Sequence, residues 1–209
     1  MRRPTPWRAV ATCQGAEWPI AAATVAATRN FSTFAAIPCQ ATEDFSAAGP
    51  TADGIIAGNA PYTHRILAVR ARVKKVISRP AVGDDRIAVA AAPEAEIAVG
   101  HVPDYCTDEV SDRALALLLT RQRRVPWLAT TIMVREVTAP EPPLPGRSSR
   151  ELPALLLTPH SAYYSGRARL EVRRRATGQI LAVLRGEQPL RVADPIMFEQ
   201  GWLRTLRDR

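Results

Sequence analysis

The glycines of this 209-residue sequence exclude several kinds of nucleotide and hydrolase site. No two of the eleven glycines are separated by a single residue, so the Gly-x-Gly turn that approaches a dinucleotide pyrophosphate is absent. Neither lysine, Lys74 or Lys75, follows a glycine, which excludes a Walker A phosphate loop. Gly54 and Gly58 are four positions apart, but they enclose Ile56 rather than the serine of a hydrolase nucleophile turn.

Histidine and cysteine are also scarce and scattered. The three histidines are too far apart in the sequence to form a local zinc pair, so no metal site is predicted. The three cysteines contain no Cys-x-x-Cys pair, and an odd number does not suit a disulfide framework. We expect three reduced thiols in a reducing compartment. These residues are His64, His101, His160, Cys13, Cys39 and Cys106.

The sequence also lacks a long apolar segment. No run approaches the roughly 20 apolar residues that a membrane-spanning helix needs, so no membrane partner is expected. Pro4, Pro6 and Arg8 stand where a signal peptide has its apolar stretch. These features predict a soluble cytoplasmic protein.

The net charge of +8 carries little information about partners. Of the 28 basic residues only Lys74 and Lys75 are lysines, asparagine is scarce and alanine is abundant, which together indicate a coding bias. The arginines are scattered along the chain rather than clustered in one segment. A nucleic-acid partner is therefore not expected, and a basic nucleic-acid binder with salt-sensitive affinity is the third alternative.

Alternating short segments predict an α/β fold with a parallel sheet. β-Branched runs of strand length alternate with alanine-rich or charged segments that favour helices and are long enough to be crossover connections. The predicted strands are residues 9–12, 33–37, 54–57, 73–78 and 96–99, and the predicted helices between them are residues 20–29, 43–48, 63–70 and 86–91.

The second half of the sequence predicts two long helices and an extended connector. Over residues 107–124, Thr107 can cap a helix whose apolar side chains Val110, Ala114, Leu117 and Leu118 recur at helical spacing. Five prolines over residues 137–153 exclude a helix there. The remaining predictions are a buried strand at residues 155–157, a helix at residues 167–184 with Arg173, Arg174 and Arg175 on its solvated side and Gly186 as its stop, and a short helix at residues 197–206.

Two blocks of sequence carry a family resemblance. They are residues 102–119, VPDYCTDEVSDRALALLL, and residues 155–165, LLLTPHSAYYS. The segments ADGIIAGNAP at 52–61, RPAVGDD at 79–85 and EVTAPEP at 136–142 add weaker support. Together they resemble the D-isomer-specific 2-hydroxyacid dehydrogenases, and more closely the bacterial branch that is similar to the C-terminal-binding proteins.

The resemblance implies a domain organisation. In that family a flavodoxin-like substrate domain is interrupted by a Rossmann domain and completed by a C-terminal helix. Here residues 1–106 would be the first part of the substrate domain, residues 107–124 the crossing helix, and residues 154–209 the C-terminal return. Residues 125–153 would replace the nucleotide-binding domain, because the interval before the residue 136 segment is too short for a βαβ unit of about 30 residues.

The resemblance also implies site residues and an NAD cofactor. His160 corresponds to the family's proton-transferring histidine and Glu141 to the glutamate that partners it. Histidine suits this role because an imidazole gains and loses a proton near neutral pH. The substrate, a small 2-hydroxy or 2-keto acid, would bind at Asn59 and at the loop of Arg79, Ala81, Val82 and Gly83.

Several positions depart from the family pattern. Ala81 replaces a glycine, and Pro80 has no N–H group to offer a substrate carboxylate. His101 stands where asparagine is usual, Glu136 stands where aspartate is usual, and the family's substrate-binding arginine has no counterpart. Taken alone, His64 and His101 are interpreted as ordinary surface or loop residues, and Cys106 as an inert thiol.

These observations predict a truncated dehydrogenase-like chain with no cofactor-binding residues and negligible turnover on its own, because hydride chemistry belongs to the cofactor. The resemblance implies that the 107–124 helix normally packs across the domain junction, so its leucine face should be left partly uncovered and favour self-association. The alternative is a non-catalytic interaction module that uses the flavodoxin-like domain or this helix to bind a partner.

Overall fold

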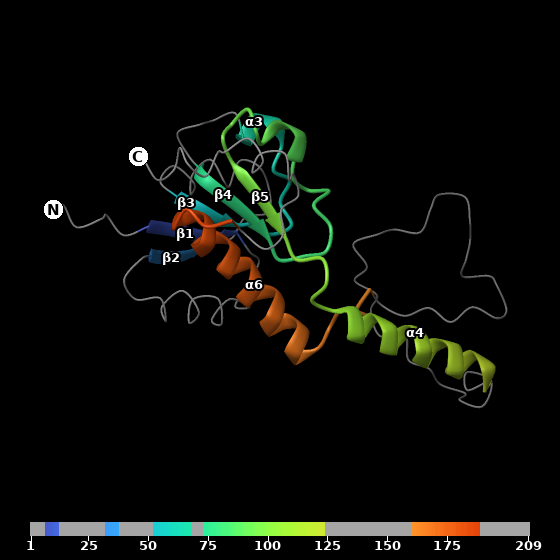
Figure 1. The fold of residues 1–209 in the computed structure, drawn as a ribbon. Helices are drawn as coiled ribbons and strands as arrows, with labels where there is room; N and C mark the ends of the chain where they lie inside the picture. The colour runs from blue at the N-terminus through green and yellow to red at the C-terminus, as the bar shows by residue number, and fades with distance from the viewer. Residues whose placement is uncertain (1–6, 13–31, 38–51, 68–72, 124–159, 189–209) are drawn as a thin grey trace. The chain divides into compact units, whose positions relative to one another are not determined.

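The structure is a computed structural model that describes residues 7–12, 32–37, 52–67, 73–123 and 160–188 (Figure 1). Five parallel strands form one sheet in the order β2-β1-β3-β4-β5, which is the flavodoxin-like order. The strands are β1 (Trp7–Thr12), β2 (Ser32–Ile37), β3 (Ala52–Ile56), β4 (Val73–Arg79) and β5 (Ala98–His101). The predicted α/β class with a parallel sheet is confirmed.

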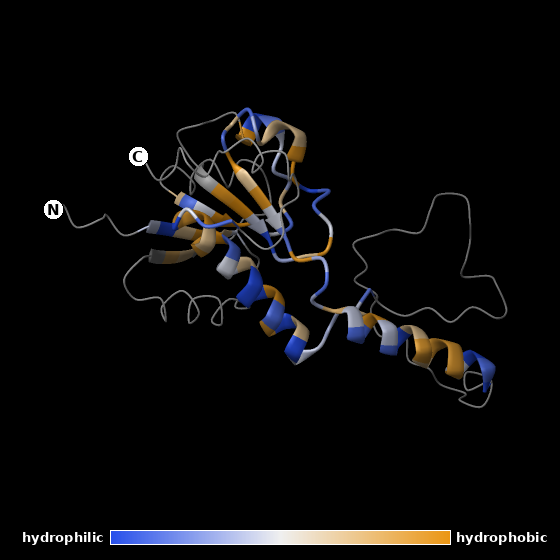
Figure 2. Ribbon diagram, viewed as in Figure 1, coloured by the Kyte–Doolittle hydropathy of each residue, from blue (hydrophilic) through white to orange (hydrophobic). Residues whose placement is uncertain are grey.

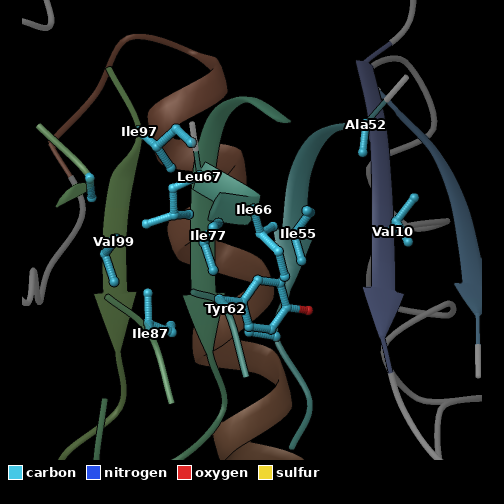
Figure 3. Close-up of a cluster of buried hydrophobic side chains, with 12 residues drawn as sticks. Val10, Ala52, Ile55, Tyr62, Ile66, Leu67, Ile77, Ile87, Ile97 and Val99 are labelled. Carbon is cyan, nitrogen blue, oxygen red and sulfur yellow. The ribbon is translucent and has the colours of Figure 1, made fainter. Parts of the chain in front are cut away.

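One face of the sheet carries the larger hydrophobic cluster. Ile55, Ile77 and Val99 project from three neighbouring strands and pack against Tyr62 and Leu67 (Figure 3). This face is covered by side chains of helix α3 (His64–Leu67) and of the 3-10 helix η1 (Val89–Ala91), among others. The alternation of side chains along each strand sends this set to one face.

The opposite face is covered by helix α6 (Gly166–Leu184). Ile180, Val183 and Leu184 pack against Ile56 and Val76 of the sheet. The helix approaches the sheet closely at Gly54, where an added Cβ would lie 2.5 Å from Ile180 Cγ2. Apolar and polar residues alternate along α6 (Figure 2), as expected of a helix with one buried face.

Both ends of α6 are capped by recognisable bonds. Ser165 precedes the helix, and its Oγ accepts a hydrogen bond from the Ala168 N–H at 2.9 Å. At the other end Gly186 has φ 76°, and its N–H donates to the Val183 carbonyl at 2.9 Å. The Glu187 N–H donates to the Ala182 carbonyl at 2.8 Å, which completes a Schellman motif. The predicted stop at Gly186 is confirmed.

Helix α4 (Thr107–Gln122) has no buried residue. Leu115, Leu118 and Leu119 are 54%, 64% and 53% exposed. The N-cap is Cys106 rather than the predicted Thr107, and no side chain bonds to the first amides. The Cys106 side chain is buried, and its thiol is free. Asp108 and Glu109 in the first turn place negative charge near the positive end of the helix.

The predicted elements within the described residues correspond to observed ones, with corrections beyond the N-cap of α4; β1 and β3 each begin two residues earlier than predicted. The prediction of a helix over residues 86–91 was wrong, since this segment forms turns and the short η1. Strand β5 starts at Ala98, two residues later than predicted, because Glu96 has φ 57° and belongs to a turn. Arg173 is buried rather than solvated, whereas Arg174 is exposed as predicted. The segments predicted at 20–29, 43–48, 137–153, 155–157 and 197–206 lie outside the described residues.

The chain divides into two compact units. The first comprises Met1–Tyr105 and Leu170–Arg209, and the second comprises Cys106–Arg169. Among the described residues, no helix has the length and apolar character needed to span a bilayer.

Candidate functional site

The carboxyl ends of parallel strands meet at one edge of a sheet, and ligands of open α/β folds bind there. In the first unit, the turn after β3 at this edge is held by a buried polar group. Thr12 Oγ1 accepts from the Gly58 N–H at 3.0 Å and contacts Tyr62 Oη and the Ile56 carbonyl oxygen. Asn59 follows Gly58 and is exposed.

The neighbouring turn, after β4, begins with a buried arginine. The Arg79 side chain is 10% exposed, and its Nη1 donates to the Gly58 carbonyl at 3.1 Å. Burial lowers the pKa of Arg79. The carboxylate of Asp85, whose Oδ1 lies 4.0 Å from Arg79 Nη2, partly offsets this effect. Arg79 Nε is buried and has no hydrogen-bond partner within the described part of the chain. Arg79 thus links the turn after β4 to the turn after β3, the two turns that are predicted to bind substrate.

The rest of the loop is anchored through its carbonyl groups. The Ala81 carbonyl accepts from the Val102 N–H at 3.0 Å, and the Val82 carbonyl is 2.8 Å from His101 Nδ1. Within residues 7–12, 32–37, 52–67, 73–123 and 160–188, no group accepts from the N–H groups of Val82 and Gly83. An added Cβ at Gly83 would lie 3.0 Å from Asp85 Oδ1, so the backbone approaches this side chain closely.

The second unit carries His160 on a turn bonded to α4. His160 is exposed, and its ring centroid lies 5.9 Å from that of Tyr163. Arg113 Nη2 donates to Ser161 Oγ at 2.5 Å, and Ser165 Oγ donates to Glu109 Oε1 at 2.7 Å. The hydrogen bond from Ser165 lowers the pKa of Glu109. These contacts fix the turn that follows His160.

An ion pair adds to this contact between α4 and the start of α6. Arg167 Nη2 lies 2.6 Å from Asp108 Oδ2, and Arg167 Nε lies 3.4 Å from Glu109 Oε1. The bond with Asp108 is the main cause that raises the pKa of Arg167. The Glu109 side chain is 12% exposed, and its Oε2 is buried without a partner among the described residues.

A pocket of about 400 Å³ lies beside these groups in the second unit. Its lining holds two carboxylates, one guanidinium, a hydroxyl and a tyrosine, but neither His160 nor any residue predicted to bind substrate. The lining residues are Glu109, Asp112, Arg113, Ser161, Ala162 and Tyr164. Within the described residues, no group of three or more His, Cys, Asp or Glu side chains is arranged to hold a metal ion.

The turn after β3 and the start of α4 do not fit the pyrophosphate of a dinucleotide. Such a ligand needs free amides at a helix N-terminus. After β3, the N–H groups of Ala57 and Gly58 donate to the Ser78 carbonyl and to Thr12 Oγ1. At the start of α4, the carboxylates of Asp108 and Glu109 would repel a phosphate.

The structure therefore gathers one of the two predicted residue sets. Asn59, Arg79, Ala81, Val82 and Gly83 lie on two neighbouring turns at the carboxyl edge of the sheet. His160 lies in the second unit. Glu141 and Glu136 lie outside the described residues.

Sequence reasoning missed two polar residues with several contacts. His101, interpreted as an ordinary residue, contacts the predicted substrate loop. Glu109, interpreted only as a helix-start acid, bonds the turn after His160 through Ser165. Their positions could have indicated both residues, because His101 is the last residue of β5 and Glu109 lies within the family-like segment of residues 102–119.

Comparisons with known proteins agree on one family. A sequence profile described as the D-isomer specific 2-hydroxyacid dehydrogenase, catalytic domain, matches residues 19–194. The human glyoxylate reductase/hydroxypyruvate reductase is 42% identical over 62 residues, which are 30% of this chain and 19% of that protein. The chain thus matches about a fifth of the length of this relative.

Solved structures show the same fold. The PH0520 protein from Pyrococcus horikoshii OT3 has a TM-score of 0.68 at 15% identity and covers 99% of both chains. A D-lactate dehydrogenase from Treponema pallidum, TP0037, has a TM-score of 0.50 at 16% identity over 58% of this chain and 37% of its own.

Proposed function

The chain belongs to the D-isomer specific 2-hydroxyacid dehydrogenase family, and from this premise we propose that it forms a substrate-binding domain of that family. The ligand is a small 2-hydroxy or 2-keto acid whose carboxylate binds the N–H groups of Val82 and Gly83. The observation that supports this is the pair of successive amides without a partner among the described residues, at the edge of the sheet where such folds bind ligands. Pro80 removes one donor from this loop, but two donors remain.

Asn59 and Arg79 frame the same site. Arg79 holds the Gly58 carbonyl and so places the turn that carries Asn59 next to the substrate loop. Its buried positive charge also favours an anion nearby. In this proposal His160 exchanges a proton with the substrate oxygen, and Glu141 orients its imidazole.

We propose that the chain alone has negligible NAD-dependent turnover. The sequence lacks the Gly-x-Gly turn, and neither the turn after β3 nor the start of α4 fits a pyrophosphate. Residues 125–153 would stand in place of the family's nucleotide-binding domain, which makes this a truncated member of the family. The free thiol of Cys106 and the odd cysteine count favour a reducing, cytoplasmic location.

The test is an NMR titration of the ¹⁵N-labelled full chain with glyoxylate, with acetamide as the uncharged control. Glyoxylate should shift the amide signals of residues 57–61 and 79–85, and acetamide should not. Shifts distributed over other segments, or none at all, would contradict the proposal.

The exposed leucines of α4 favour a second function, an interaction module that binds a second copy or another protein. Light scattering at high protein concentration should then show an oligomer that Leu118→Glu reduces to a monomer. A monomeric wild-type chain would remove self-association through α4.

A further inference from the structure

The loop that carries the proposed anion-binding amides is fixed by two bonds to its carbonyl oxygens. One comes from the Val102 backbone at 3.0 Å, and the other involves His101 Nδ1 at 2.8 Å from the Val82 oxygen. A carbonyl oxygen only accepts hydrogen bonds, so Nδ1 of His101 carries the hydrogen. The neutral imidazole is thus the Nδ1–H tautomer, and its Nε2 has the lone pair.

Peptide geometry converts these carbonyl bonds into a direction for the amides. In a planar trans peptide the C=O and the following N–H point in opposite directions. The peptide bonds here are not cis among the described residues. Fixing the Ala81 carbonyl therefore directs the Val82 N–H away from β5, and fixing the Val82 carbonyl directs the Gly83 N–H away from His101. The direction of the Gly83 N–H is therefore set by the bond between His101 and the Val82 carbonyl.

We propose that His101 is a positioning residue, which sets the Val82–Gly83 peptide so that the Gly83 N–H binds the substrate carboxylate. This inference rests on the proposed function of the loop. The remaining anchor, Arg79, bonds the Gly58 carbonyl and acts on the start of the loop rather than on this peptide. His101 is therefore the side chain in direct control of the Gly83 amide.

The backbone of His101 is itself fixed from the other face of the sheet. Its carbonyl accepts from Gln179 Nε2 at 2.8 Å, and Gln179 Oε1 accepts from Ser78 Oγ at 2.6 Å. Ser78 and Gln179 are buried, so water does not compete for these bonds. A chain of polar contacts thus runs from α6 through the end of β5 to the substrate loop.

The first experiment measures oxalate binding to the full chain through the amide shifts of Val82 and Gly83. His101→Leu removes the donor but keeps a side chain of moderate size, and His101→Asn keeps a donor at the same δ position. His64→Leu is the matched control, because His64 is an exposed histidine of α3 for which the described residues show no hydrogen bond to this loop. Circular dichroism establishes that each variant is folded.

We expect His101→Leu to weaken oxalate binding about tenfold, the effect of one lost hydrogen bond, while His101→Asn and His64→Leu stay close to wild type. Unchanged binding by His101→Leu would overturn the role of His101 and leave the proposed loop function standing. A wild-type chain whose Val82 and Gly83 amides ignore oxalate would overturn both.

A second experiment needs no ligand. Long-range ¹H–¹⁵N spectra of the wild-type imidazole should show the hydrogen of neutral His101 on Nδ1. A hydrogen on Nε2 instead would overturn the inference, because the bond to the Val82 carbonyl would then have no donor.

Discussion

Helices α4 and α6 have similar lengths and comparable apolar content, but they are stabilised differently. Six apolar residues of α6 are buried, and those near its end pack on the sheet around Ile56 and Val76. Helix α4 has no buried residue, and Asp108, Glu109 and Arg113 make polar contacts from it. The buried residues of α6 are Ala168, Val172, Ala176, Ile180, Val183 and Leu184. Helical periodicity alone therefore identifies a helix without identifying what stabilises it.

The largest expected effect is the difference in lost stability between truncating an isoleucine of α6 and truncating a leucine of α4. Ile180→Ala should cost about 2–5 kcal/mol of unfolding free energy, because it leaves a cavity against the sheet. Leu118→Ala, at a position that is 64% exposed, should change stability by less than about 0.5 kcal/mol. Urea unfolding of both variants measures the difference, and equal losses would show that α4 is packed as α6 is.

Two glycines of the first unit allow a comparison between a packed and an open position at α6. Gly54→Ala should cost about 1–3 kcal/mol, since the new Cβ would lie 2.5 Å from Ile180 Cγ2 and 3.2 Å from Val76 Cγ1. Gly178→Ala meets no atom within 4 Å and should stabilise α6 by up to about 1 kcal/mol. Thermal unfolding should move the two midpoints in opposite directions. A tolerated alanine at position 54 would disprove the close approach of α6 to the sheet.

A hydroxyl links α4 to the start of α6. Ser165→Ala removes the N-cap bond to Ala168 and the bond to Glu109, and should destabilise the chain by about 1 kcal/mol. Ser165→Thr keeps the hydroxyl and serves as the control in chemical denaturation. The interpretation fails if threonine and alanine at this position are equally destabilising.

The smallest effect concerns the ion pairs on the outer side of α6. Bonds from Arg174 and Arg175 lower the pKa of Glu171 from its ordinary 4.5 to about 2. A lowered folded-state pKa stabilises the protein above the unfolded value and loses that contribution as pH falls. Because these side chains are partly solvated, Glu171→Gln should cost less than about 1 kcal/mol at pH 7.

The pH dependence of that variant checks the sign. The stability difference between Glu171→Gln and wild type should shrink as pH falls from about 4.5 to about 2. Glu187→Gln, just beyond the helix, is the control, and a difference for Glu171→Gln that persists at pH 2 would contradict the ion pairs.

Local sequence patterns predicted much of this fold for physical reasons. The β-branched runs around Ile55 and Ile77 fill the buried centre of the sheet, and Gly186 supplies the left-handed residue that ends α6. A helix was wrongly predicted over residues 86–91 because the alanines there favour one. The path of this segment is instead set by backbone hydrogen bonds from the Ile87 N–H to the Asp84 carbonyl and from the Ala88 N–H to the Tyr62 carbonyl. Tertiary contacts outweigh propensity there.

The candidate site was predictable only in part. The loop at Arg79 to Gly83 follows from family-like sequence, but the role of His101 requires its distance to the Val82 carbonyl, a contact between separate segments. The burial of Arg173 among three consecutive arginines likewise depends on the orientation of α6. Sequence spacing does not contain either fact.

We propose that this chain keeps the substrate-binding residues of the 2-hydroxyacid dehydrogenase family, while its sequence lacks the Gly-x-Gly turn of a dinucleotide site. Following NADH absorbance with the purified full chain and a panel of 2-keto acids that includes glyoxylate tests it most directly. We expect no oxidation above the protein-free rate. Saturable oxidation that is lost in His160→Ala would contradict it and show that the chain binds and uses the cofactor.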